Sequence, residues 1–212
     1  VSVHIGGASY RLDAWLNGSY IGSHEGAYTP FSFDISPAMR TAAQNELVLR
    51  VASLSKTGPV DGLLLQQCPA SKQAWYYIEA GLWGNVYLEA CPPLWCEGVS
   101  IEPDLQKQRV LIEVETRNGL REPRECMLHL VVTDPTGKIA AELTPAVALL
   151  PGATRHAYRV QLDRPLPWSC ENPALYRVKV TLIVDGAPSD RLSATFGMRD
   201  FTVCDGQFLL NG

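Results

Sequence analysis

The sequence predicts an all-β protein made of two consecutive β-sandwiches. Short apolar runs that alternate with polar residues dominate the chain, and turn-forming dipeptides separate them at the close spacing typical of antiparallel sheets. The 212 residues are 46% hydrophobic and 19% charged, which supplies enough apolar material for two cores of roughly 100 residues each. This composition also lies outside the range of disordered chains.

A hairpin near the N-terminus is the clearest local signal of the first sandwich. Apolar and polar residues alternate over 10–16, and Asn17-Gly18 follows at once. Both residues of this pair tolerate the positive φ that a two-residue type I′ turn requires. A returning strand is expected from Tyr20 to Gly22. Further strands of this sandwich are expected at Phe31–Ile35, Glu46–Val51 and Val86–Ala90.

Between these strands the sequence predicts a short helical turn and a long loop. Ser36-Pro37 is typical of an N-cap followed by proline at the first helical position. Residues 53–73 carry several Gly and Pro turn signals but no sustained periodicity. We therefore expect a long loop there, of the kind that is often functional on a β scaffold.

The second sandwich is expected to follow a boundary at Pro92-Pro93, because consecutive prolines cannot continue a ladder of hydrogen bonds. The predicted domains are 1–92 and 93–204, followed by the short segment 205–212. Roughly six or seven short strands in about 100 residues are typical of an immunoglobulin-like sandwich. The strands expected in this domain are Val110–Glu115, Met127–Thr133, Lys138–Leu143, Thr154–Leu162, Leu175–Val184 and Arg191–Phe196.

Composition argues against several classes of function. The net charge of −4 and the scattered Lys and Arg residues argue against a nucleic-acid partner and an anionic membrane surface. No apolar run approaches the ~18 residues of a membrane span. The cysteines have irregular spacing without a Cys-x-x-Cys pair, so we expect no metal site, free and mostly buried thiols, and a reducing compartment such as the cytoplasm. No nucleotide-binding loop is present, and no cofactor is expected.

No complete catalytic constellation can be assembled from the sequence. The Gly-x-Ser-x-Gly nucleophile motif is absent. His24-Glu25 lacks the second histidine of a zinc protease, because Tyr28 occupies that position. Retaining glycosidases need two carboxylates about 5 Å apart. Glu25, Glu79 and Glu89 lie near aromatic residues, but nothing in their spacing pairs them, so no catalytic residue is predicted in this chain.

The densest group of aromatic residues lies in 73–83, which contains Trp75, Tyr76 and Trp83. Aromatic rings stack on the apolar faces of sugars, while neighbouring Gln, Asn and Glu side chains bond sugar hydroxyls. The alternative is that these rings fill the core of the first sandwich or a domain interface, and this alternative is favoured for Trp83.

Several segments together resemble glycoside hydrolase family 2, which contains β-galactosidases, β-glucuronidases and β-mannosidases. Residues 14–35 are similar to the signature of the family's sugar-binding domain. The other similar segments, which occur in the family's order, are Asn45–Val51, Lys72–Tyr76, Gly81–Glu89, Asn172–Val178, Phe196–Phe201 and Phe208–Gly212. Each segment is a weak signal alone, but the ordered set is specific and covers nearly the whole chain.

The resemblance implies a partial jelly-roll (galactose-binding-like) β-sandwich followed by an immunoglobulin-like β-sandwich. The early half of the jelly roll would lie before Val1, and the (β/α)₈ barrel with the family's two catalytic glutamates would follow Gly212. The chain would then be the non-catalytic front portion of a retaining glycosidase of carbohydrate metabolism, where it positions the barrel and shapes the sugar cleft. Half a jelly roll leaves open strand edges, which predicts a homo-oligomer.

The resemblance also suggests which residues contact sugar. Trp75, Tyr76, Glu79 and Asn85 lie in the loop before the closing strand of the first domain, which reaches the active site in several family members. Trp75 stands where β-glucuronidases have an aspartate, and Leu82 replaces the aspartate of a Trp-Asp-Trp-Gly pattern found in mannosidases. Asn85 stands where some β-galactosidases have a sugar-contacting aspartate, so a β-galactosidase-like parent is favoured.

The expected partners are a β-glycoside and the catalytic barrel of the same polypeptide, with no nucleic acid and no membrane. Two other functions stay open at this point. One is a stand-alone carbohydrate-binding module, to which the aromatic segment points. The other is a structural or adhesive pair of β-sandwiches with no role in sugar chemistry.

Overall fold

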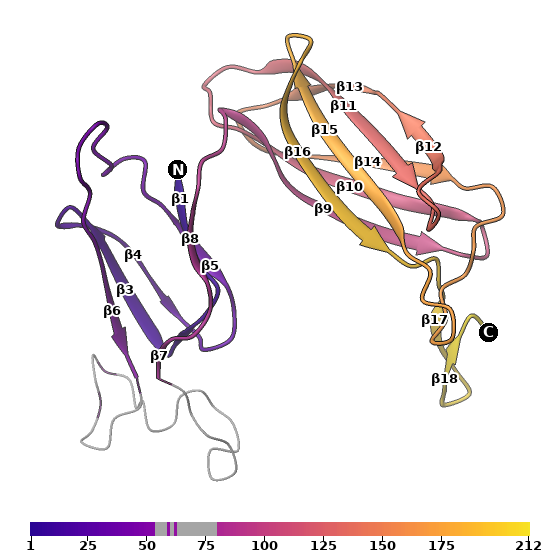
Figure 1. The fold of residues 1–212 in the computed structure, drawn as a ribbon, viewed down its shortest axis with the longest axis horizontal. Coiled ribbons are helices and arrows are strands. Elements are labelled where there is room, and N and C mark those ends of the chain that lie inside the picture. Colours follow the sequence, from indigo (N-terminus) through magenta and orange to yellow (C-terminus); the bar gives the residue numbers. More distant parts are fainter. Residues whose placement is uncertain (54–58, 60–61, 63–79) are drawn as a thin grey trace. The chain divides into compact units, whose positions relative to one another are not determined.

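The computed structural model describes residues 1–53, 59, 62 and 80–212, and these residues form an all-β structure, which confirms the predicted class (Figure 1). The chain divides into two compact units, Val1–Ala90 (unit 1) and Cys91–Gly212 (unit 2). None of the described segments is a helix with the length and hydropathy of a membrane span.

Unit 1 contains two three-stranded antiparallel sheets, β5-β1-β8 and β4-β3-β6, and a short pair, β2-β7. Its strands in the described residues are β1 (Ser2–Ile5), β2 (Ala8–Ser9), β3 (Arg11–Leu16), β4 (Ser19–Glu25), β5 (Phe31–Asp34), β6 (Leu47–Ala52), β7 (Gly81–Leu82) and β8 (Val86–Glu89). The strands expected around residues 10–22, 31–35, 46–51 and 86–90 are therefore present.

The β3–β4 hairpin has the turn that its sequence predicts. Asn17 and Gly18 have φ values of 53° and 82°, as a type I′ turn requires. The Asn17 side chain also accepts a hydrogen bond from the Glu46 backbone N–H and donates to the Ala38 carbonyl. The turn therefore fixes the positions of two neighbouring segments as well as the register of the hairpin.

The helical turn expected at Ser36-Pro37 was wrong, since these residues form a single hydrogen-bonded turn and no helix. Asp34 accepts the Ser36 backbone N–H at 2.9 Å, so the capping role falls two residues earlier than predicted. The Ala38 carbonyl, which would continue a helix, instead accepts a hydrogen bond from Asn17. This tertiary contact uses the carbonyl that a second turn would need, so the chain makes one turn and forms no helix.

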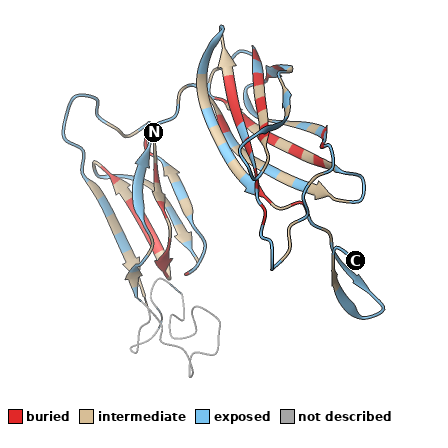
Figure 2. Ribbon diagram, turned by 45° about the vertical axis from the view of Figure 1, so that its right-hand side comes forward, coloured by how far each residue is buried: buried red, intermediate tan, exposed pale blue. Residues whose placement is uncertain are grey.

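The core of unit 1 draws its side chains from both of its larger sheets, and Figure 2 colours the buried residues red. The fully buried members are Val3, Ile5, Ala8, Leu12, Ala14, Leu16 and Ile35. On β8, Val86 pairs with Ile5 and Leu88 pairs with Val3, so these side chains share the inner face. They are nevertheless 43% and 65% exposed. Apolar side chains that face the core are thus left in solvent along β8.

Unit 2 is a β-sandwich whose two main sheets, β14-β10-β9 and β12-β11-β15-β16, share one core, with β13 also paired to β11 (Figure 1). Its strands are β9 (Leu94–Asp104), β10 (Arg109–Asn118), β11 (Arg124–Thr133), β12 (Ile139–Leu143), β13 (Ala146–Leu149), β14 (Gly152–Gln161), β15 (Tyr176–Val184), β16 (Ala187–Phe196), β17 (Phe201–Cys204) and β18 (Gln207–Leu210). Alternate residues of β10 are buried along its whole length, as the period of a strand demands.

The six strands expected in this unit are present, but the sequence analysis missed β9, β13 and the β17–β18 hairpin. The hairpin is joined to the sandwich at its base. Asp200 and Asn211 exchange hydrogen bonds of 3.0 and 2.8 Å, and the Asn211 side chain donates to the Trp168 carbonyl. Phe201 and Phe208 stack beyond this base with their ring centroids 5.8 Å apart.

The cysteines are less buried than predicted. Cys96 and Cys126 are buried free thiols, whereas Cys91, Cys170 and Cys204 are exposed. Cys68 lies outside the described residues. Burial, with the nearby Asp190 carboxylate, raises the pKa of the Cys96 thiol to about 12. The expectation of mostly buried thiols is therefore wrong for the described cysteines, because Cys91 and Cys170 lie outside the strands and Cys204 ends the exposed strand β17.

We expect thiol reagents to separate these two groups. The native chain at about pH 8 should be labelled by iodoacetamide at Cys170 and Cys204 and protected at Cys96 and Cys126, because only an accessible thiolate reacts. Peptide mapping by mass spectrometry measures each site, and the denatured chain is the control for full reactivity. Labelling of Cys96 at the rate of Cys204 would contradict its burial.

Candidate functional site

Of the residues predicted to contact sugar, only Asn85 lies in the described part of the chain. Trp75, Tyr76 and Glu79 lie outside it. Asn85 is exposed in the link between β7 and β8, and its carbonyl accepts the Gly6 backbone N–H at 2.8 Å. This bond joins the link to the segment between β1 and β2, so the position of Asn85 is set by residues far away in the sequence.

Trp83 is the best-defined aromatic side chain of this region. Its indole N–H donates to the Ala27 carbonyl at 2.8 Å, which fixes the orientation of the ring. The ring lies against Gly7 so closely that a Cβ at Gly7 would come within 2.5 Å of indole atoms Cε2 and Cζ2. Trp83 remains 46% exposed all the same. The ring is thus held in one place without being buried.

Glycines bring the two segments together beneath this ring. The backbone N–H groups of Trp83 and Gly84 both donate to the Gly7 carbonyl, at 3.2 and 3.3 Å. A Cβ at Gly84 would lie 2.4 Å from backbone atoms of Gly6 and Gly7. Only a residue without a side chain allows this approach, so the contact depends on glycine for space rather than for an unusual φ.

Tyr28 lies beside Trp83, with ring centroids 6.2 Å apart and an interplanar angle of 57°. It is 68% exposed. Next to it, Thr29 Oγ1 and His24 Nε2 are 3.1 Å apart, and the His24 ring stacks on Phe31. From the sequence, Trp83 was expected to pack in a core or a domain interface, and Tyr28 was not predicted to take part in binding. The glycines Gly6, Gly7 and Gly84 could have indicated a close approach of two backbone segments. The sequence does not show that Gly84 meets Gly6 and Gly7, because it lies more than 70 positions later in the chain.

Ser9 and Ser53 connect this region to the end of β6. The long loop predicted over residues 53–73 lies outside the described residues, apart from positions 53, 59 and 62. Ser53 Oγ donates to the Ser9 carbonyl at 2.5 Å and accepts the Gly81 N–H at 3.2 Å. Gly81 is therefore held beside β2, in the same β2–β7 pair that leads into the link carrying Trp83.

Charged residues on β3, β4 and β6 form ion pairs with one another. Arg11 Nη2 lies 3.3 Å from the buried carboxylate of Asp13, and Arg11 Nη1 lies 3.2 Å from Glu25. Arg50 approaches Asp13 at 3.8 Å. These ion pairs compensate the buried charge of Asp13, and we assign them a structural role.

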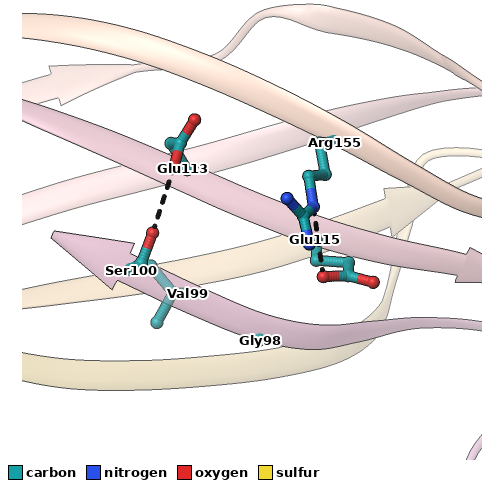
Figure 3. Close-up of a pocket in the computed structure, with 6 residues that line it drawn as sticks. All are labelled: Gly98, Val99, Ser100, Glu113, Glu115 and Arg155. Carbon is teal, nitrogen blue, oxygen red and sulfur yellow. Dashed lines mark hydrogen bonds and ion pairs between the residues drawn. The ribbon is translucent and has the colours of Figure 1, made fainter.

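Unit 2 has a shallow hollow on the outer face of β9 and β10, shown in Figure 3. Arg155 Nε lies 3.4 Å from Glu115, and Ser100 Oγ donates to Glu113 at 3.4 Å. Glu113 and Glu115 lie on the same face of β10 and are both partly exposed. In the described residues, no group of three or more His, Cys, Asp or Glu side chains is arranged to hold a metal ion.

Known proteins with similar sequences are glycoside hydrolases. Residues 96–199, which lie in unit 2, match the model of the glycosyl hydrolases family 2. A β-galactosidase of Thermoanaerobacter pseudethanolicus is 26% identical over all of this chain, and so is a β-glucuronidase of Felis catus. A β-galactosidase of Lactobacillus delbrueckii subsp. bulgaricus is 27% identical, also over all of this chain. The chain spans between 20% and 34% of the length of these relatives.

Solved structures share the fold over the whole chain. The β-glucuronidase of Bacteroides uniformis superposes with a TM-score of 0.86 at 23% identity, and this chain covers 26% of it. A family 2 member from Bacteroides cellulosilyticus superposes with a TM-score of 0.83 at 22% identity, with 28% of that chain covered. The family model over residues 96–199, the alignments over the whole of this chain and the shared β-sandwich fold agree, and all three make this chain similar to members of glycoside hydrolase family 2.

Proposed function

We propose that this chain is a non-catalytic portion of a retaining family 2 glycosidase that hydrolyses O-glycosidic bonds. In this proposal the predicted domains 1–92 and 93–204 are a sugar-binding jelly-roll part and an immunoglobulin-like domain, and 205–212 leads toward a catalytic barrel. The chain positions the barrel and shapes the sugar cleft.

One observation carries the proposal. The relatives named β-galactosidase and β-glucuronidase align with the whole of this chain, yet the chain accounts for only 20–34% of their length. A segment that recurs complete within much longer hydrolases is best understood as one of their accessory regions.

A β-galactosidase-like activity is the preferred form of the proposal. The residue differences at Trp75, Leu82 and Asn85 favour it over the glucuronidase and mannosidase patterns. Trp75, Tyr76, Glu79 and Asn85 stay predicted sugar contacts, with the β-glycoside and the barrel as partners. Homo-oligomerisation also stays a prediction, for which the exposed inner face of β8 at Val86 and Leu88 supplies a physical reason.

The purified chain of 212 residues should release no nitrophenol from p-nitrophenyl β-galactoside, and a longer polypeptide that contains this chain and a barrel should release it. Both proteins are assayed by absorbance at equal concentration, with circular dichroism as the control for folding. Turnover by the short chain alone would refute the proposal, and so would an inactive, folded long form that cleaves no β-glycoside.

A further inference from the structure

The arrangement around Trp83 places an aromatic ring at the surface and holds it there. The indole N–H is bonded to Ala27, and one side of the ring lies on Gly7. The backbone of the next residue, Gly84, lies directly against the backbone of Gly6 and Gly7. A tryptophan that only filled a core would be buried, but Trp83 is 46% exposed. Fixing an exposed ring lowers the entropy lost when a ligand stacks on it.

Tyr28 extends this surface. Its ring is 68% exposed and lies 6.2 Å from that of Trp83. A tilted pair of rings offers apolar area to the axial C–H groups on one face of a pyranose. Asn85 and Thr29 are exposed nearby in the chain and supply neutral groups that can bond sugar hydroxyls.

The charges near the pair favour a neutral sugar over an anionic one. A uronic acid needs a cation to compensate its carboxylate. In the described segments 6–11, 24–30 and 81–85 the one Lys or Arg is Arg11, and it is engaged by Asp13 and Glu25.

We propose that Trp83 and Tyr28 form a stacking platform on unit 1 for a neutral β-hexopyranoside, with Gly7 as the residue that positions the indole. The choice of a sugar as ligand rests on the proposed function. The platform is a binding site of this chain itself and does not depend on hydrolysis.

The test is a titration of the 212-residue chain with methyl β-galactopyranoside, followed by ligand-observed NMR. Saturable binding in the millimolar range is expected. Trp83→Ala and Tyr28→Ala should each weaken binding, by about tenfold for Trp83. Gly7→Ala should weaken it without removing either ring, because the new methyl group displaces the indole.

The matched control is the second aromatic pair of unit 1, Trp15 and Tyr20, whose ring centroids are 5.6 Å apart on the β3–β4 hairpin. Trp15→Ala should leave binding unchanged. Tyr28→Ala keeps the test valid if Trp83→Ala impairs folding, since Tyr28 is mostly in solvent.

Three results would overturn the platform: no saturable binding, equal affinity in the wild-type and Tyr28→Ala chains, or methyl β-glucuronide binding as tightly as the galactoside. Each leaves the proposed function standing, because that is decided by hydrolysis in the longer polypeptide. Activity of the longer form together with loss of sugar binding in Gly7→Ala would support both.

Discussion

Replacing Gly84 with alanine is expected to destabilise unit 1 by about 4 kcal/mol. The new Cβ would lie 2.4 Å from backbone atoms of Gly6 and Gly7, and a backbone cannot move aside as a flexible side chain can. Relief of the clash would separate the two segments. That separation would break the hydrogen bonds from Trp83 and Gly84 to the Gly7 carbonyl, each worth about 1 kcal/mol.

Urea denaturation followed by tryptophan fluorescence and circular dichroism measures this effect. The control is Gly98→Ala on β9, since a Cβ there has nothing within 4 Å and its φ is not in the left-handed region. The control chain should unfold at the wild-type midpoint. A Gly84→Ala chain with unchanged stability would show that the segments 6–7 and 83–84 do not pack as closely as described.

Replacing Leu130 with alanine is the second large effect, and it should fall on unit 2. Leu130 is fully buried at the centre of β11, where it pairs with Val180 on β15 and Leu143 on β12. Removing a buried leucine side chain loses its transfer free energy and leaves a cavity, at a cost of about 3 kcal/mol. The strands on both sides of Leu130, β12 and β15, are held by their ladders of hydrogen bonds and cannot easily move to fill the cavity.

Differential scanning calorimetry measures this loss of stability as a lower midpoint temperature for the thermal unfolding of unit 2. Met127→Ala on the same strand is the matched control, because Met127 is 42% exposed and its loss should change stability by no more than about 0.5 kcal/mol. Equal effects of the two substitutions would mean that the sheets of unit 2 do not enclose Leu130.

Local chemistry explains which elements could be predicted. Asn17-Gly18 specified its turn type because two adjacent positive φ values are open to few residue pairs. The strand around Val110 and Ile112 was predictable because every second residue meets the core. The helical turn at Ser36-Pro37 failed because Asn17, nineteen positions earlier than Ser36, takes the carbonyl that a helix would use.

The surface around Trp83 shows the opposite case. A tryptophan between Leu82 and Gly84 has the same local pattern whether it is buried or exposed. What decides its state is Gly7, which lies beneath the ring, and Ala27, which accepts its N–H. Both contacts depend on pairing between segments remote in the sequence, and alternation within one strand carries no information about them.

By itself, the sequence determined the all-β class, most of the strands and the resemblance to glycoside hydrolase family 2, because period-2 patterning, turn chemistry and ordered motifs are local properties. The tertiary structure alone decided that Val86 and Leu88 on an inner face stay exposed, that Cys96 is buried while Cys204 is not, and that Trp83 is held at the surface. Burial and orientation depend on which strands become neighbours, and that choice is made only when the whole chain folds.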